Sequence, residues 1–431
     1  MKRIFFGTIV ALLSAAVWAQ PRTDADFTKL LEGINGAPAR SILSYPDSFR
    51  VQIIYTQIDR NAKGVPSFRH HYFHVDPELY FNPASMVKMP LAFLSLEKMK
   101  QLQSYGVDKY TPLQIDSSYP RQRSMLRDLS SEDSMPSIAH FIKRALIISE
   151  NDPYNRMYQF LGQGPIHRSL QQKGYTSARI ARQFMGFTDE ENRHTNRMVF
   201  LDKQGRVLYD QPPAYNADSF RFPGSPVLVG RAHMNRNDEL VPAPFDFTRQ
   251  NNLSLQDMQQ MLQAVIFPAS VPKNKRFDLL EEDRRFLLQY LSQYPSETNY
   301  PKYDDSVFYD SYVKFFFNDS THRMPPHVRV FNKVGWAYGF LTDVSYVIDT
   351  AQHIDYFLSA TVYVNSDGVV NDSKYDEETM GFPFFRALGQ LIHSYELARP
   401  RKHRPSLSMG DLRYEHRDPK DTRPTIREAD N

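Results

Sequence analysis

The chain has no cysteine among its 431 residues. Disulfide bonds and attachment of a lipid to a cysteine are therefore excluded. An excess of one charge is also missing, because 52 lysines and arginines against 49 aspartates and glutamates leave a net charge of +3. So small an excess argues against nucleic acid as a partner. No apolar run is long enough for a comfortable membrane span, so we expect none in the mature protein.

The N-terminus has the pattern of a secretory signal. Lys2 and Arg3 form a charged start, residues 4–16 are apolar, and small residues precede a cleavage position after Ala19. We therefore predict a signal peptide over residues 1–19 and a periplasmic or secreted protein. An uncleaved membrane anchor is the alternative interpretation.

Apolar stretches of strand type lie at both ends of the chain, and helical patterns lie between them. We predict an α+β fold in which an antiparallel sheet, drawn from residues 49–75 and 327–365, holds an inserted helical part over residues 85–295. Residues 178–250 within it are rich in arginine, asparagine, aspartate and proline and predict an irregular insert. The domain would span residues 20–398.

Residues 399–431 are charged, contain proline and have little apolar content. Such a segment cannot bury enough apolar surface to offset the entropy of ordering it. The composition therefore predicts a disordered tail.

Ser85 and Lys88 stand at the entrance to a long apolar run. One helical turn would place the two on the same face. A serine hydroxyl becomes a good nucleophile when a nearby base takes its proton, and a lysine can do so if its surroundings keep it neutral. The spacing alone is weak evidence, because it recurs elsewhere, for example at Ser311 and Lys314.

Two further motifs follow in order along the chain: Ser-Glu-Asn at residues 149–151 and Lys-Val-Gly at residues 333–335. The three motifs in this order resemble those of the penicillin-recognising serine hydrolases, and of class A β-lactamases most closely. The likeness covers roughly residues 27–396. It implies the β-lactamase/transpeptidase-like fold, with the sheet flanked by helices.

The resemblance also implies the catalytic roles. Ser85 would be the acylated nucleophile, and Lys88 would be its base or proton relay. Ser149 would pass a proton to the leaving nitrogen. The helix N-terminus at Ser85 favours the negative charge that develops there.

Four residues would bind substrate by the same resemblance: Asn151, Lys333, Gly335 and Trp336. Asn151 would hydrogen-bond the substrate's amide, and Lys333 would attract its carboxylate. Lys333, as a second cation, would also help to lower the pKa of the catalytic lysine. Backbone N–H groups of Ser85 and Trp336 would form the oxyanion hole.

The sequence departs from the class A pattern in three places. Val334 replaces the usual hydroxyl residue, which removes one hydrogen bond to a substrate carboxylate, and Glu150 replaces the usual aspartate. Class A enzymes also carry a glutamate, with an asparagine four residues on, that activates the deacylating water. Glu190 and Glu191 are the possible bases in the comparable stretch, but both are out of that register. We therefore hypothesise intact acylation with slow deacylation or an unfamiliar base.

These observations leave three functions open. The first is hydrolysis of β-lactams through an acyl-enzyme on Ser85, and the second is a D,D-peptidase activity on cell-wall peptides. The third is a non-catalytic penicillin- or peptide-binding sensor. We expect a monomer that acts on a small-molecule β-lactam or a peptidoglycan peptide without a cofactor or a metal; the nearby histidines at residues 70, 71 and 74 lack the pattern of a metal site.

Overall fold

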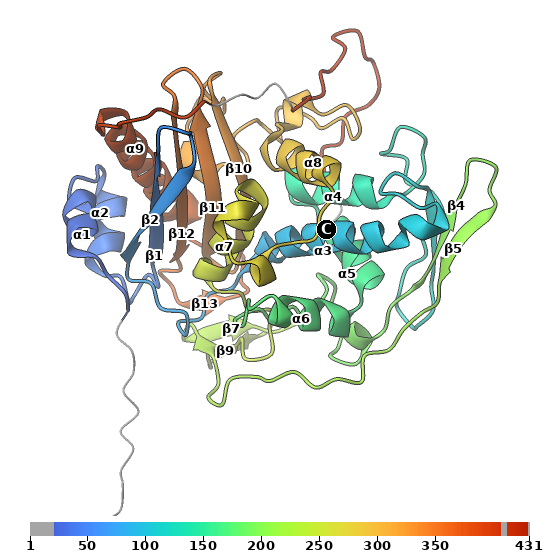
Figure 1. Cartoon of the computed structure of the whole chain (residues 1–431). Helices are drawn as coiled ribbons and strands as arrows, with labels where there is room; N and C mark the ends of the chain where they lie inside the picture. The colour runs from blue at the N-terminus through green and yellow to red at the C-terminus, as the bar shows by residue number, and fades with distance from the viewer. Residues whose placement is uncertain (1–20, 407–411, 430–431) are drawn as a thin grey trace, which may run out of the picture.

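A five-stranded antiparallel sheet forms one half of the molecule, in the order β10–β11–β12–β1–β2 (Figure 1). The computed structural model describes residues 21–406 and 412–429. The strands are β1 (Gln52–Arg60), β2 (Pro66–Phe73), β10 (Val328–Ala337), β11 (Phe340–Asp349) and β12 (Ile354–Tyr363). β1 pairs with β12, with Gln52 opposite Thr361. The prediction of an α+β fold whose sheet joins both ends of the chain is confirmed.

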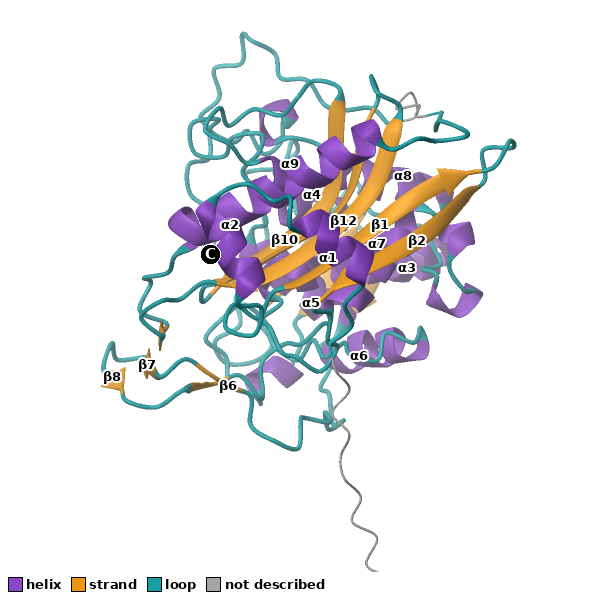
Figure 2. Cartoon of the chain, turned by 90° about the vertical axis from the view of Figure 1, so that its left-hand side faces the viewer, coloured by secondary structure: helices purple, strands orange, loops and turns teal. Residues whose placement is uncertain are grey.

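Helices cover both faces of the sheet. Figure 2 shows α1 (Ala25–Leu31), α2 (Ala37–Ser44) and α9 (Phe382–Ala398) on one face. α7 (Leu255–Ile266) packs on the other face against β11 and β12. Because both faces are covered, every residue of β11 is buried, and the central strands are apolar without strict alternation.

The helical part is built around α3 (Lys88–Leu102), which lies at its centre in Figure 1. Residues 88–96 of α3 are all buried, as expected for a helix that is apolar on nearly every side. Its neighbours are α4 (Ile138–Ile147), α5 (Asn151–Leu161) and α8 (Glu281–Ser292), and α6 (Gln163–Gln172) packs against α5. Ser137 caps α4 by accepting a hydrogen bond from the backbone N–H of His140 over 3.2 Å.

The predicted irregular insert holds several short strands. Two of them, β4 (Arg197–Leu201) and β5 (Val207–Gln211), form one small sheet with β3 (Leu113–Asp116), which precedes the insert in the chain. β6 (Leu228–Val229) pairs with β9 (Phe245–Asp246), and β7 (Ala232–Met234) lies between β8 (Leu240–Val241) and β13 (Val369–Val370). The pairing of β7 with β13 ties the insert to the loop that follows the central sheet.

The tail differs from the prediction of disorder over the part that the structure describes. Residues 412–429 lie against α4, α8 and the loop before β10, and Ile426 forms a parallel bridge with Tyr303. Composition did not indicate these contacts because most of them are ion pairs and hydrogen bonds with residues far away in the sequence. Glu415, for example, accepts from Lys143 over 2.7 Å and from Tyr290 over 2.9 Å.

The predicted signal peptide lies outside the described residues. Among the residues that the structure does describe, no helix is both long and apolar enough to cross a bilayer.

Candidate active site

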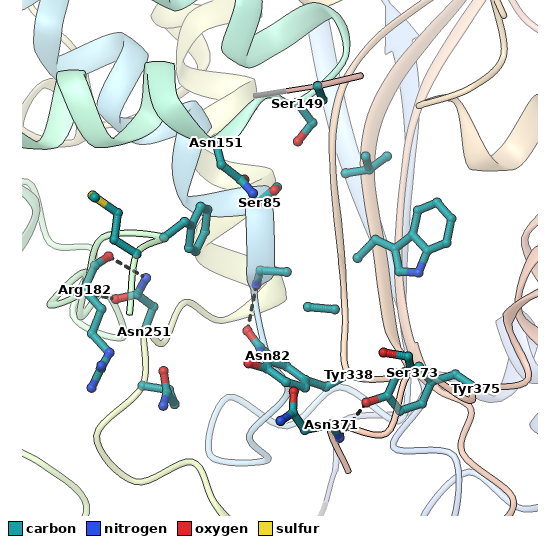
Figure 3. Close-up of a pocket in the computed structure, with 18 of the residues that line it drawn as sticks. Asn82, Ser85, Ser149, Asn151, Arg182, Asn251, Tyr338, Asn371, Ser373 and Tyr375 are labelled. Atoms are coloured by element: carbon teal, nitrogen blue, oxygen red, sulfur yellow. Dashed lines mark hydrogen bonds between the residues drawn. The ribbon is translucent and has the colours of Figure 1, made fainter. Parts of the chain in front are cut away.

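Ser85 lies on a short 3-10 turn, Ala84–Val87, that continues directly into α3. The backbone of Ala84 is held at a φ of 43°, a conformation that a residue with a Cβ seldom adopts. Its N–H donates to the side-chain oxygen of Asn82 over 2.9 Å, as Figure 3 shows. This turn leaves Ser85 half-buried on the wall of a cleft, at the N-terminal side of the helix.

Lys88 lies one turn beyond Ser85 and is completely buried. Its ammonium nitrogen Nζ donates to Ser85 Oγ over 2.8 Å and to Asn151 Oδ1 over 2.8 Å. It also contacts the backbone carbonyl of Ser149, and it lies 3.3 Å from the Oγ of that residue. The first two sequence motifs therefore meet at one nitrogen atom.

Burial is the main cause that lowers the pKa of Lys88 well below its ordinary value, and the positive charge of Lys333 lowers it further. The carboxylate of Glu150 acts in the opposite direction but does not compensate. A lysine that loses its proton this easily can accept one from a neighbouring hydroxyl.

Ser149 joins α4 to α5 in a left-handed backbone conformation, with a φ of 69°. Lys333 Nζ donates to its Oγ over 2.7 Å, so the Ser149 hydroxyl lies between the two buried lysines. A non-glycine residue persists in this conformation only where its surroundings over-determine it. Glu150 points away from the cleft: it accepts from Arg144 Nε over 3.1 Å and from the Tyr303 hydroxyl over 2.7 Å.

Lys333 comes from β10 and is almost completely buried. Burial is the main cause that lowers its pKa to about 7, the charge of Asp343 opposes this, and the charge of Lys314 adds to it. Lys314 is itself buried and donates to Asn332 Oδ1 over 2.6 Å, and Asn332 in turn donates to Asp343 over 2.9 Å. The sequence does not indicate this polar network behind Lys333. Lys314 appears there only as part of the recurring spacing of Ser311 and Lys314, which by itself is weak evidence for a site.

Gly335 allows β10 to approach the turn that carries the nucleophile. A Cβ at this position would lie 2.4 Å from the backbone oxygen of Pro83. A glycine is therefore required by close packing rather than by an unusual backbone conformation. Trp336, the next residue, lines the cleft and donates from its indole nitrogen to Glu377 Oε1 over 2.9 Å.

The cleft has a volume of about 950 Å³. It is lined by Ser85, Ser149 and Asn151, by residues of the insert and by the loop after β12. Figure 3 shows Tyr338, Asn371, Ser373 and Tyr375 at the end of the cleft away from Ser149. The three sequence motifs do not extend to this end of the cleft. Its one indication in the sequence is the irregular insert predicted over residues 178–250, which supplies part of the lining of the cleft.

None of the described residues that line the cleft is an aspartate or a glutamate, whereas Arg182 and Arg236 both line it. Glu190, proposed from sequence as a possible base, lies 3.3 Å from His194 Nε2. Glu191, the other one, pairs with Arg121 Nη1 at 2.9 Å. Neither is a lining residue, so the structure does not bring them to Ser85.

An aromatic ring instead lies beside the lysine: the ring centroid of Phe184 is 5.3 Å from Lys88 Nζ. Asn155 fixes the backbone there, because its Oδ1 accepts from the Phe184 N–H over 2.8 Å. Sequence reasoning missed Phe184, since a phenylalanine in an irregular segment carries no chemical signal of its own.

No group of three or more metal-ligating side chains occurs within the described part of the chain. Of the histidines considered above, His70 contacts Thr56 Oγ1 at 2.8 Å and His71 stacks on Tyr55.

A half-buried serine in contact with a buried lysine of lowered pKa is the arrangement of nucleophile and base that a serine hydrolase uses. The sequence agrees with the geometry, because it matches the model of the β-lactamase enzyme family over residues 45–395, and the chain belongs to that family. A comparison with curated protein sequences gave no match.

Several solved structures are similar to this chain. One is a β-lactamase from Desulfarculus baarsii, with 14% identity over 84% of this chain and 99% of that chain and a TM-score of 0.44. Another is a β-lactamase from Xanthomonas campestris pv. campestris, with 13% identity, 82% and 97% coverage and a TM-score of 0.44. A class A β-lactamase from Mycobacterium abscessus shares 12% identity over 83% and 98%, with a TM-score of 0.43.

Proposed function

We propose that the protein opens β-lactam amides by forming an acyl-enzyme on Ser85. The observation that carries the proposal is the contact of 2.8 Å between Ser85 Oγ and the Nζ of a completely buried Lys88. In its neutral form this lysine takes the hydroxyl proton while the serine oxygen attacks the lactam carbonyl carbon. Removal of the proton in the acylation step therefore uses only Ser85 and Lys88.

Ser149 then protonates the leaving nitrogen. Its Oγ lies within 2.7 Å of Lys333 Nζ and 3.3 Å of Lys88 Nζ, so the proton taken from Ser85 can pass through Lys88 to Ser149. The serine oxygen–carbon bond forms, the carbon–nitrogen bond breaks, and the nitrogen receives the proton. Asn151 holds the amide side chain of the substrate, and Lys333 attracts its carboxylate.

The developing oxyanion is bound by the backbone N–H groups of Ser85 and Trp336 in this proposal. The approach of β10 to the turn before α3, which Gly335 permits, supports that role. Loss of one such donor typically costs about 10²–10³ in rate.

We further propose that the acyl-enzyme is long-lived. Its hydrolysis needs a base that activates water, and the described lining contains no carboxylate while Phe184 lies beside Lys88. The same observation favours a second candidate function, a D,D-peptidase acting on cell-wall peptides, for which a β-lactam would be an inhibitor. Cleavage after Ala19, export to the periplasm and action as a monomer complete the proposal.

The test is the intact mass of the protein after incubation with penicillin. A stable adduct on the wild-type protein, absent from Ser85→Ala, supports the proposal and the slow second step. Rapid turnover of nitrocefin without an adduct supports an efficient β-lactamase instead. If the wild-type protein neither turns over nitrocefin nor gains mass, the proposed acylation is wrong. N-terminal sequencing and light scattering of the exported protein test cleavage and oligomeric state.

A further inference from the structure

The C-terminal segment, residues 412–429, is anchored to the body of the protein at several points. Near its start, Glu415 accepts from Lys143 on α4 and Tyr290 on α8, and it accepts from the N–H of Asn299 over 2.8 Å. Farther on, Lys302 Nζ donates to the carbonyl oxygens of Asp421 and Arg423 over 2.7 and 2.9 Å. The segment thus provides hydrogen-bond partners for polar groups of the helical part and of the loop that follows it.

The end of the segment pairs with the loop that carries Tyr303. The Ile426 N–H donates to the Lys302 carbonyl over 2.8 Å, and the Asp304 N–H donates to the Ile426 carbonyl over 2.9 Å. Ile426 also packs against an apolar cluster that contains Tyr303 and Ile148. The backbone on both sides of Tyr303 is therefore held by the tail.

Tyr303 connects this pairing to the second catalytic motif. Its side chain is completely buried, and its hydroxyl donates to Glu150 Oε1 over 2.7 Å. Glu150 stands between Ser149 and Asn151, the two residues that contact Lys88. With the φ of Ser149 at 69°, the turn keeps a conformation that a non-glycine residue seldom adopts.

The same segment reaches the cleft itself, because Ala429 is one of its lining residues. The segment thus reaches the site at two places. Ala429 lines the wall of the cleft, and the pairing with the loop at Tyr303 leads to Glu150 of the second motif.

We propose that residues 412–429 are a positioning element for the acylation site, which acts through Tyr303 and Glu150 on the turn at Ser149 and Asn151. The inference rests on the proposed function for its kinetic consequence, but the effect on the turn is independent of it. The tail holds Tyr303, Tyr303 fixes the Glu150 carboxylate, and the carboxylate keeps the two neighbouring side chains directed at Lys88.

Two substitutions in the full-length chain test the element at different links. Tyr303→Phe removes only the hydroxyl that reaches Glu150, and Ile426→Asp removes the apolar contact of the tail. Ile426→Val is the conservative counterpart that keeps this contact. Tyr356→Phe is the matched control, because Tyr356 is equally buried and its hydroxyl contacts His393 of α9 rather than a residue of the catalytic motifs.

Two measurements are made on each variant. The first is the rate at which a fluorescent penicillin labels the protein, and the second is amide hydrogen exchange over residues 148–152 and over β11. We expect Tyr303→Phe to slow labelling by about 10-fold, the order for one lost hydrogen bond to a charged group. Ile426→Asp should slow labelling in the same direction. Exchange should rise over residues 148–152 and stay unchanged in β11. Ile426→Val and Tyr356→Phe should behave like the wild-type protein.

Unchanged exchange over residues 148–152 in both variants would overturn the inference, whatever the labelling rate. Exchange that rises equally in β11 would also overturn the inference, since the tail would then stabilise the whole fold rather than the turn at Ser149. A wild-type protein that is not labelled at all would refute the proposed function alone. The exchange data would still decide whether the tail positions the turn.

Discussion

Replacing Lys333 by methionine should shift the pH dependence of acylation. Lys333 Nζ lies 2.7 Å and Lys88 Nζ lies 3.3 Å from the same Ser149 oxygen, so the two charges are no more than about 6 Å apart. At an effective dielectric constant of about 20, their repulsion is then at least about 3 kcal/mol. A repulsion of this size is large enough to change which protonation state of Lys88 the folded protein favours.

The direction of the shift follows from the charge. The pKa of Lys333 is lowered to about 7, so below that pH it carries a proton and disfavours a second proton on Lys88. In Lys333→Met this repulsion is gone and the pKa of Lys88 rises. Because the neutral form of Lys88 is the base, the acid limb of the rate profile should move to higher pH.

Stopped-flow labelling with a fluorescent penicillin at saturating concentration measures the acylation step separately from substrate affinity, which Lys333 also affects. Lys98→Met is the matched control, because Lys98 is another mostly buried lysine of α3, bound to Gln211 over 2.6 Å outside the cleft. Its substitution should leave the profile in place. An acid limb that does not move in Lys333→Met would refute the assignment of Lys88 as a base tuned by its neighbour.

Three other predictions concern different parts of the molecule. Phe184→Glu should shorten the lifetime of the penicillin adduct by a factor of at least about 10², the lower range for a general base. Phe184→Gln should leave the lifetime unchanged. An unchanged adduct lifetime in both variants would contradict the role given to this position. Gly335→Ala forces a Cβ to 2.4 Å from the Pro83 oxygen. Calorimetry should therefore show a loss of about 1–3 kcal/mol in the free energy of unfolding, and labelling by penicillin should slow. Normal labelling would show that β10 need not approach the turn so closely. Burial is the main cause that lowers the pKa of His140 to about 3 from 6.5, so the unfolded chain gains a proton that the folded chain does not as pH falls between these values, and stability falls. His140→Gln should flatten this acid decline in denaturant unfolding, and an equally steep decline would show that other groups cause it.

The chemistry of the first motif could be predicted from the sequence because it depends on local geometry. A serine and a lysine separated by one helical turn share a face in any helix, and the contact between Ser85 and Lys88 is of that kind. The sheet was predictable for a related reason, since the apolar residues in the strand-type stretches at both ends of the chain need partners that bury them. The order of strands in the sheet agrees with that expectation.

The residues that surround the catalytic groups could not be predicted, because they come from segments that are distant in the sequence. No local pattern indicates that Phe184 lies beside Lys88, or that Lys314 and Asp343 stand behind Lys333. The contacts of the tail could not be predicted for the same reason. Most of them are single ion pairs and hydrogen bonds with partners more than a hundred residues away, such as Lys143, and composition does not indicate such pairings.

The sequence by itself determined which groups were available for chemistry: two hydroxyls, two amines and an amide in three short motifs. The tertiary structure decided their protonation and their neighbours. Burial and the distance between charges set the pKa values of Lys88 and Lys333, and both quantities exist only once the chain is folded.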